Sequence, residues 1–149
     1  VVAGLDHAVV LTAQGAAYAW GSNRCGQLGT GDFIDALTPQ RILSSHTIVD
    51  VAVGAEHTLA LASVDALLAF GCNARGALGI GSANLGKHAT PQTVTSVETF
   101  TAIAAAGAHS VGLTEQGAVY TWGANNQGQL GASRVFARAA TTRTSRTDD

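Results

Sequence analysis

The sequence predicts an all-β fold that forms part of a β-propeller, with about three four-stranded antiparallel blades. Three observations support this prediction. A segment of about fifty residues recurs three times, short apolar runs end at glycines, and only 12% of the 149 residues are charged. A period of this length is typical of repeat architectures, and four short strands in each repeat are typical of a propeller blade.

One signature defines the repeat: an aromatic residue, a glycine, an asparagine two positions later, and then Gly-x-Leu-Gly. It occurs at residues 20–29, 70–79 and 122–131. We expect these positions to be structural, because they recur in every repeat whereas a catalytic site needs one constellation. With the glycines before the first two histidines, the structural positions are Gly4, Trp20, Gly21, Asn23, Gly26, Leu28, Gly29, Gly54, Phe70, Gly71, Asn73, Gly76, Leu78, Gly79, Trp122, Gly123, Asn125, Gly128, Leu130 and Gly131.

Each repeat is predicted to begin with three short strands. The first precedes a histidine, the second follows it, and the third ends at the aromatic residue. Between the second and third strands stand Gly15, Asp65 and Gly117, residue types that tolerate the positive φ of a tight turn. Alanine-rich residues 102–108 could form a helix, but the equivalent residues 51–54 are β-branched and end in glycine, which favours a strand.

A fourth strand is expected at residues 40–43, after Pro39, and at residues 92–97, after Pro91, since proline is tolerated at a strand entrance. The repeats are therefore placed at about residues 1–47, 48–99 and 100–131. No proline and no periodic strand pattern follow this last repeat, so residues 132–149 are expected to be a disordered or diverged tail.

Charge, hydropathy and cysteine usage narrow the range of partners and compartments. Up to residue 131 the chain has four basic and eight acidic residues, a net charge of −4, so direct nucleic-acid binding is not expected. No apolar run is long enough to span a membrane. Cys25 and Cys72 occupy different positions within their repeats and are not expected to pair. Unpaired thiols are typical of a reducing compartment, so an intracellular location, cytoplasmic or nuclear, is expected.

No catalytic residue, metal site or cofactor is predicted. Histidines recur thirteen residues before each aromatic residue, and this symmetry favours a structural role over converging metal ligands. Residues 81–87 fit the start of a phosphate-binding loop. However, His88 stands where a serine or threonine would bind magnesium, and Pro91 opposes the helix that such a loop needs.

The signature, together with the histidine and the turn glycine, resembles the regulator of chromosome condensation repeat over residues 1–131. The resemblance implies a seven-bladed β-propeller, of which three repeats would form an open arc. We therefore expect the remaining blades of a longer parent chain, or self-association, to cover the open faces. Phe70 replaces the family's tryptophan, and Ala106 stands where the first repeat has Gly4.

The leading functional prediction is a non-catalytic protein-interaction scaffold, because turns that differ between repeats would be displayed on a uniform frame. The resemblance also implies an alternative, a guanine-nucleotide exchange factor for a Ran-like small GTPase. Its partner-facing residues would be those in the turns at the histidines: Asp6, His7, Glu56, His57 and His109. A third possibility is the substrate-recruiting repeat domain of a HECT-type ubiquitin ligase, with the catalytic domain elsewhere.

Overall fold

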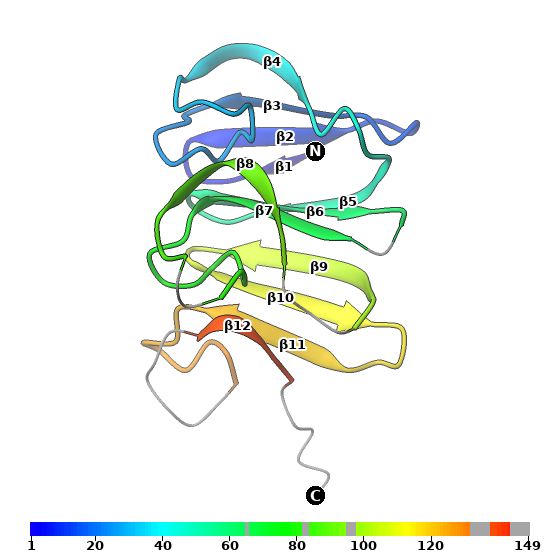
Figure 1. Ribbon diagram of the computed structural model, residues 1–149, viewed down its shortest axis with the longest axis vertical. Helices are drawn as coiled ribbons and strands as arrows, with labels where there is room; N and C mark the ends of the chain where they lie inside the picture. The colour runs from blue at the N-terminus through cyan, green and yellow to red at the C-terminus, as the bar shows by residue number, and fades with distance from the viewer. Residues whose placement is uncertain (65, 82–83, 95–97, 132–137, 144–149) are drawn as a thin grey trace, which may run out of the picture.

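The computed structural model consists of three four-stranded antiparallel sheets stacked one above another (Figure 1). It describes residues 1–64, 66–81, 84–94 and 98–131 and the backbone of residues 138–143. Blade 1 contains β1 (Val2–Ala3), β2 (His7–Leu11), β3 (Ala17–Gly21) and β4 (Ala36–Ile42). Blade 2 contains β5 (Ile48–Val53), β6 (His57–Ala62), β7 (Leu67–Cys72) and β8 (Lys87–Thr93). Blade 3 contains β9 (Phe100–Ala106), β10 (His109–Thr114), β11 (Val119–Gly123) and β12 (Arg138–Arg143).

Within each blade the strands follow one another in sequence order, so each sheet is a simple meander. The register repeats as well, because the histidine of each second strand lies opposite the glycine that follows the aromatic residue of the third strand. The prediction of an all-β partial propeller with three four-stranded blades is confirmed. In the described part of the chain we find no helix able to cross a bilayer.

The fourth strands of the first two blades begin earlier than predicted. β4 starts at Ala36 and β8 at Lys87, so Pro39 and Pro91 lie inside these strands rather than at their entrances. Both strands are at the outer edge of their sheets, where one side of the backbone needs no ladder partner, and a proline without an N–H is accommodated there. The ladder is also irregular at this point, since the register of β3 against β4 shifts after Ala19.

The expectation that residues 132–149 form only a tail is wrong for residues 138–143. They form β12, which pairs antiparallel with β11 and places Arg143 opposite Tyr120. The strand forms because it can pair with the edge of β11. The sequence of residues 138–143 alone does not predict this pairing. Residues 132–137 and 144–149 lie outside the described residues. The alanine-rich segment forms β9 (Phe100–Ala106) and the turn after it, not a helix.

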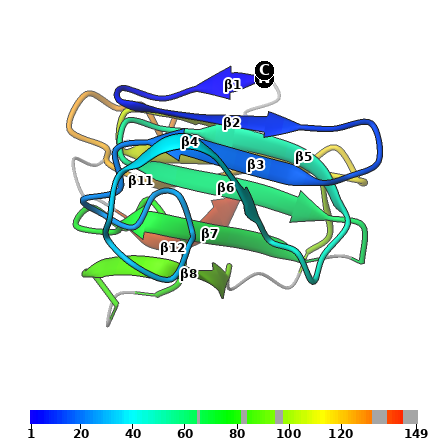
Figure 2. The same cartoon turned by 90° about the horizontal axis from the view of Figure 1, so that it is seen from above.

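Seen from above, the sheets overlie one another (Figure 2). The apolar core lies between the blades rather than within any one of them. One cluster joins blades 1 and 2 and includes Val9, Leu28 and Phe70, and another joins blades 2 and 3 and includes Leu59, Leu78 and Trp122. Every residue of β6 is buried, whereas burial in β2 and β10 is partial. Blade 2 is thus covered on both faces, and blades 1 and 3 each have one open face.

Candidate functional site

The loop after each third strand, which carries the second half of the signature, is held by its asparagine. Asn23, Asn73 and Asn125 are at most 1% exposed. Their side-chain oxygens accept the backbone N–H groups of the signature leucines at 3.0, 2.9 and 3.0 Å. A buried amide with a satisfied hydrogen bond fixes the loop in one conformation, so asparagine recurs for a structural reason.

The last glycine of each of the first two signatures receives the aromatic ring of the next blade. Gly29 and Gly79 have positive φ angles of 70° and 69°. A Cβ atom on Gly29 would lie 2.8 Å from the ring of Phe70, and one on Gly79 would lie 2.9 Å from Nε1 of Trp122. Both rings are 0% exposed. The signature is therefore a socket for the following blade's aromatic residue.

Trp20 is one of the expected structural positions, but its side chain is only half-buried in this structure. The cause is the position of blade 1 at the end of the stack, since in the described residues no blade precedes it. The repeat predicts that this tryptophan packs against a preceding blade, as Phe70 and Trp122 do. It does not show whether the surface of a preceding blade is there to receive the ring.

A histidine also ties each blade to the next. Nε2 of His7 lies 3.0 Å from the hydroxyl of Thr58, and that hydroxyl donates to the carbonyl of Gln27 at 2.7 Å. A hydroxyl has one proton to donate, so here it must accept the bond from His7. The ring of His7 therefore carries its hydrogen on Nε2. We call this arrangement the histidine latch.

The second interface repeats the latch. Nε2 of His57 lies 2.9 Å from the hydroxyl of Ser110, which donates to the carbonyl of Ala77 at 2.8 Å. The indole N–H of Trp122 donates to the same carbonyl at 2.9 Å. His109, the equivalent histidine of blade 3, is only half-buried because no fourth blade covers it in the described residues.

Burial keeps the first two histidines uncharged. Burial lowers the pKa of His7 to about 4, against a smaller upward effect of the Asp6 carboxylate. Burial likewise lowers the pKa of His57 to about 4, with smaller contributions from His7 and His109. Protonation of His7 would add an N–H at Nδ1, a buried atom that has no hydrogen-bond partner in the described part of the chain. Both rings are therefore neutral at physiological pH, as the latch requires.

The residues predicted to face a partner differ in their exposure to solvent. His7 and His57 are 4% and 1% exposed, so the expectation that their rings face a partner is wrong: the next blade covers them. The side chains of Asp6 and Glu56 are exposed beside them, and His109 is half-buried. The acids of these turns are thus available to a partner, whereas the first two histidines are not.

The turns before the histidines and the signature loops lie at one end of the blades, on the left in Figure 1. The N–H of Ser22 donates to the carbonyl of Asp6 at 2.8 Å, and that of Cys72 donates to the carbonyl of Glu56 at 2.9 Å. We call this edge of the molecule the turn end. The β2–β3, β6–β7 and β10–β11 hairpins lie at the opposite, hairpin end.

Blade 1 has an exposed groove of about 510 Å³ at the turn end, next to β4. Ile34 and Leu37 line it and are 72% and 97% exposed. Asp32 and Asp35 add two carboxylates to the lining of the groove, and Arg41 adds one guanidinium. Hydrogen bonds from the Ile34 N–H and then from the Thr30 hydroxyl lower the pKa of Asp32, so this carboxylate stays charged.

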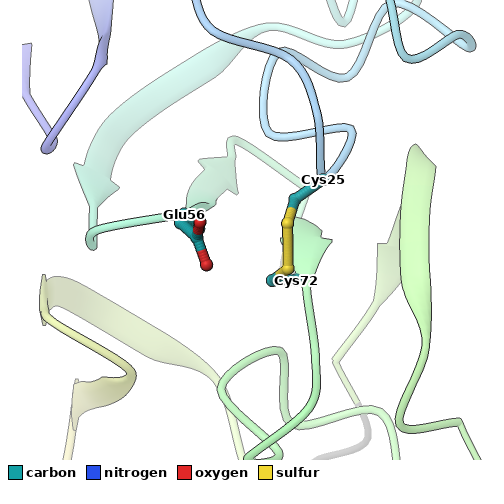
Figure 3. Close-up of side chains that lie close together, drawn as sticks. All are labelled: Cys25, Glu56 and Cys72. Atoms are coloured by element: carbon teal, nitrogen blue, oxygen red, sulfur yellow. A yellow bond between two sulfur atoms is a disulfide. The ribbon is translucent and has the colours of Figure 1, made fainter.

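Cys25 and Cys72 form a disulfide between the loop of blade 1 and the end of β7, with Glu56 beside it (Figure 3). The prediction that they do not pair is wrong. Position 25 of one repeat and position 72 of the next are not equivalent in sequence, but stacking of the blades brings their Cα atoms to 5.0 Å. Because the two cysteines are paired, they no longer indicate a reducing compartment, and the intracellular location stays a prediction.

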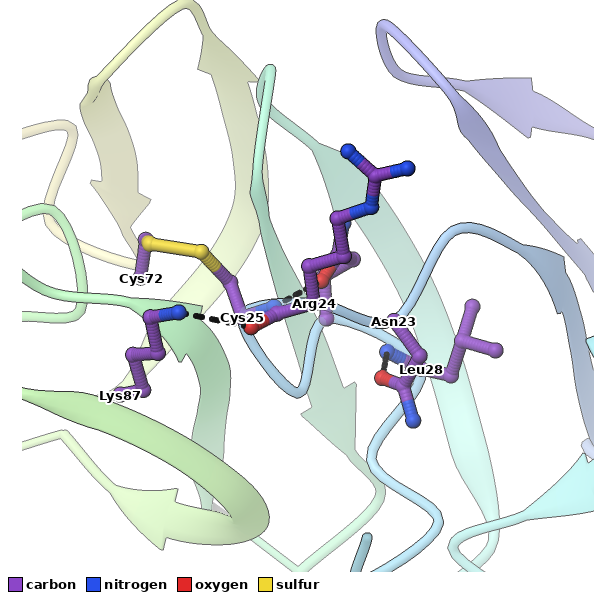
Figure 4. The surroundings of a disulfide bond; sticks show 7 residues. Asn23, Arg24, Cys25, Leu28, Cys72 and Lys87 are labelled. Atoms are coloured by element: carbon purple, nitrogen blue, oxygen red, sulfur yellow. Dashed lines mark hydrogen bonds between the residues drawn. A yellow bond between two sulfur atoms is a disulfide. The ribbon is translucent and has the colours of Figure 1, made fainter. Parts of the chain in front are cut away.

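The segment that fits the start of a phosphate-binding loop, residues 81–87, leads into β8 rather than into a helix. The ammonium group of Lys87 donates to the carbonyl of Arg24 in blade 1 at 2.9 Å (Figure 4). The lysine that would bind a phosphate therefore connects two blades. Residues 82 and 83 lie outside the described residues.

The profile of the regulator of chromosome condensation (RCC1) repeat matches residues 14–61 and 65–113, and a second profile of this repeat matches residues 100–129. The chain belongs to this family. Among solved structures, yeast Prp20, an RCC1 protein, superposes with a TM-score of 0.86 at 26% identity, over 97% of this chain and 37% of that one. Human WBSCR16 has the same fold, with a TM-score of 0.85 at 22% identity over 95% of this chain and 36% of that one.

Curated relatives are much longer than this chain. The human X-linked retinitis pigmentosa GTPase regulator is 47% identical over 130 residues, which is 87% of this chain and 13% of that protein. The Arabidopsis thaliana ultraviolet-B receptor UVR8 is 32% identical over 88% of this chain and 30% of its own length. The human E3 ubiquitin-protein ligase HERC2 is 36% identical over 88% of this chain and 3% of its own length.

Proposed function

We propose that this chain is a non-catalytic protein-interaction scaffold that binds a protein partner through its turn end. One observation carries the proposal: positions that recur between repeats are buried in the contacts between blades, and positions that differ are exposed at one end. Asp6, Glu56 and Ala108 are equivalent positions with different side chains, and the first two are exposed. A rigid frame with variable loops is a common arrangement for binding.

The groove of blade 1 is the part of the turn end best suited to a partner. Its exposed apolar side chains, Ile34 and Leu37, stand next to the carboxylates of Asp32 and Asp35. Large apolar groups on a surface favour association, and flanking carboxylates favour a partner with basic groups around an apolar contact.

The test compares apolar substitutions at the two ends of the molecule. Partners are first recovered with the wild-type protein, and their affinities for Ile34→Ser, Leu37→Ser and Val64→Ser variants are then measured by calorimetry. Val64 is the matched control, because it is 77% exposed at the hairpin end. We expect about a tenfold loss of affinity or more for the first two variants and no change for the third. If folded turn-end variants bind every partner as well as wild type does, the proposal fails.

A second candidate function is guanine-nucleotide exchange on a small GTPase. Prp20 has a structure reported together with its binding to Gsp1p, another relative is named a GTPase regulator, and the carboxylates of Asp6 and Glu56 are exposed in the corresponding turns here. Nucleotide release from a Ran-like GTPase should be accelerated by the protein and slowed by Asp6→Asn and Glu56→Gln, but not by Glu115→Gln at the hairpin end. An unchanged release rate with the wild-type protein rejects this candidate.

Recruitment of substrates for a ubiquitin ligase would be a special form of the scaffold role. It is supported by the similarity to HERC2, which is named an E3 ubiquitin-protein ligase. It is tested by asking whether the recovered partners become ubiquitylated in a manner that depends on Ile34 and Leu37.

A further inference from the structure

We propose that Cys25, Cys72 and Glu56 bind a zinc ion when the disulfide is reduced. The two Sγ atoms and a carboxylate oxygen of Glu56 lie within 4.8 Å of one another (Figure 3). Thiolate sulfur and carboxylate oxygen are both zinc ligands, and three protein ligands leave the fourth tetrahedral position for water. The site would join blade 1 to blade 2, and it does not depend on the proposed function.

Contacts other than the disulfide hold Cys25 against blade 2. The ammonium group of Lys87 donates to the carbonyl of Arg24, the residue before Cys25, at 2.9 Å (Figure 4). On the other side of the cysteine, the N–H of Gly31 donates to the carbonyl of Ala89 at 2.9 Å. Because both bonds cross from the blade 1 loop to β8, reduction of the disulfide leaves the loop in place.

The backbone at the other two ligands is also held independently of the disulfide. The N–H of Cys72 donates to the carbonyl of Glu56 at 2.9 Å, and the turn that carries Glu56 is tied to blade 3 by the bond from the Ala55 N–H to the Gly107 carbonyl at 2.8 Å. A backbone that is already in place when the ion arrives loses little conformational entropy on binding, so only the side chains have to be ordered.

The required rearrangement is small. With Zn–S bonds of about 2.3 Å at a tetrahedral angle, two thiolate sulfurs lie about 3.8 Å apart. The Cα atoms of the two cysteines are 5.0 Å apart, so rotation of the side chains after cleavage of the S–S bond supplies this separation. A Cα separation suited to a disulfide thus also suits two zinc ligands.

The surroundings provide access and balance the charge. A cavity of about 140 Å³ beside Cys72 is also lined by Glu56 and Arg75 and leaves room for a water molecule on the ion. Glu56 is exposed and Cys72 half-buried, so an ion can enter from solvent. Two thiolates and a carboxylate carry a charge of −3, and the Arg75 guanidinium offsets the single negative charge that remains after Zn²⁺ binds.

The repeat itself does not require the cysteine pair. At the next interface the equivalent positions hold Arg75 and Ala124, and blades 2 and 3 stack without a covalent link there. Oxidation and zinc binding are then mutually exclusive states of one pair. The disulfide offers no thiolate to the ion, and bound zinc withholds both thiolates from oxidation.

The chemistry balances with a phosphine as reductant. The phosphine takes an oxygen atom from water, the S–S bond accepts the two electrons, and the two hydrogens of that water reach the sulfurs as thiol protons. Zinc binding then displaces both protons, so affinity rises with pH until both sulfurs are ionised.

The experiment titrates Zn²⁺ into the phosphine-reduced protein and into the oxidised protein without oxygen, against a chromophoric chelator. Co²⁺ serves as a spectroscopic probe, because thiolate ligands give it a charge-transfer absorption. We expect one Zn²⁺ per reduced chain, at least 100-fold weaker binding to the oxidised chain, and at least tenfold weaker binding to reduced Glu56→Gln. The control Glu115→Gln, which changes an exposed acid at the hairpin end, should bind as wild type does.

Cys25→Ser and Cys72→Ser each remove one of the two thiolates and should weaken the Co²⁺ charge-transfer band, and the double variant should abolish it. The proposal is overturned if the reduced protein takes up no stoichiometric zinc, if either serine variant binds as tightly as wild type, or if Glu56→Gln binds unchanged. The reduced wild type and Glu56→Gln retain both cysteines, so the decision does not depend on the serine variants folding. Circular dichroism of each reduced sample verifies that its sheets remain intact.

Discussion

The two interfaces between blades use the same latch but are reinforced differently. Between blades 1 and 2 the ring on the glycine socket is Phe70, and a disulfide links the blades. Between blades 2 and 3 the ring is Trp122, whose indole N–H donates to the carbonyl of Ala77 at 2.9 Å.

Comparison of the two interfaces separates the contacts that both of them contain from the contacts that only one of them contains. The histidine, a hydroxyl residue and the glycine socket are present at both interfaces. The ring of Phe70 has no N–H group that could donate to the carbonyl of Gln27. Among the side chains of the described residues, only the Thr58 hydroxyl donates a hydrogen bond to that carbonyl. A covalent link stands at the interface that lacks the indole bond, so the two interfaces gain stability from different sources.

Loss of a buried aromatic ring should cause the largest effects. We expect Trp122→Ala and Phe70→Ala each to lower the free energy of unfolding by about 3–5 kcal/mol, because both rings are fully buried between blades. Trp20→Ala should cost only about 1 kcal/mol, since this tryptophan is half-buried. Urea denaturation of the three variants measures the difference. Equal losses at Trp20 and Trp122 would contradict the open face of blade 1.

Removing the disulfide should affect the first interface alone. Replacing both cysteines by serine should lower the free energy of unfolding by about 2–4 kcal/mol, because a cross-link between residues 47 apart restricts the unfolded chain. The measurement is denaturation of the oxidised wild type and of the double variant, with exchange of the Trp122 indole proton as a report on the second interface. Faster indole exchange in the double variant would show that the interfaces are coupled.

Acidification should weaken both latches. The pKa of His7 and of His57 is about 4 in the folded chain and about 6.5 when unfolded, so the unfolded chain binds more protons between these values. Their contribution to stability is complete above pH 6.5 and is lost as the pH falls towards 4, by up to about 3 kcal/mol for each histidine.

The control for this prediction replaces each histidine with glutamine, which does not titrate. Denaturation of His7→Gln and His57→Gln between pH 7 and pH 4 should show a smaller decline in stability than wild type shows. A decline as steep as that of wild type would assign the acid sensitivity to other groups.

Loss of either latch hydroxyl, that of Thr58 or that of Ser110, should cause the smallest losses of stability, and the two losses should differ. Thr58→Val leaves His7 and the Gln27 carbonyl without that hydroxyl and should cost about 1–3 kcal/mol. Ser110→Ala should cost less, about 1 kcal/mol, because the Ala77 carbonyl keeps the indole N–H of Trp122. Thermal denaturation ranks the two variants, and a larger loss for Ser110→Ala would contradict this account.

Much of the candidate site could be predicted because its causes are local. Asn23 bonds to the N–H of Leu28, five residues away, and Gly29 turns the chain at a positive φ, so these residue types recur wherever the loop recurs. The surface that covers His7 could not be predicted, because the Thr58 hydroxyl that it meets belongs to the next blade, 51 residues further along the chain.

By itself, the sequence determined the first three strands of each blade, the turns between them and the three-blade repeat, since periodicity and glycine placement act over a few residues. Only the tertiary structure decided that Cys25 meets Cys72, that residues 138–143 complete the third blade, and that Trp20 lies open while Trp122 is covered. Each of these three features depends on which part of the chain packs against the residue in the folded structure. Stacking of the blades brings together segments that are about fifty residues apart in the sequence. A local sequence pattern does not contain this information.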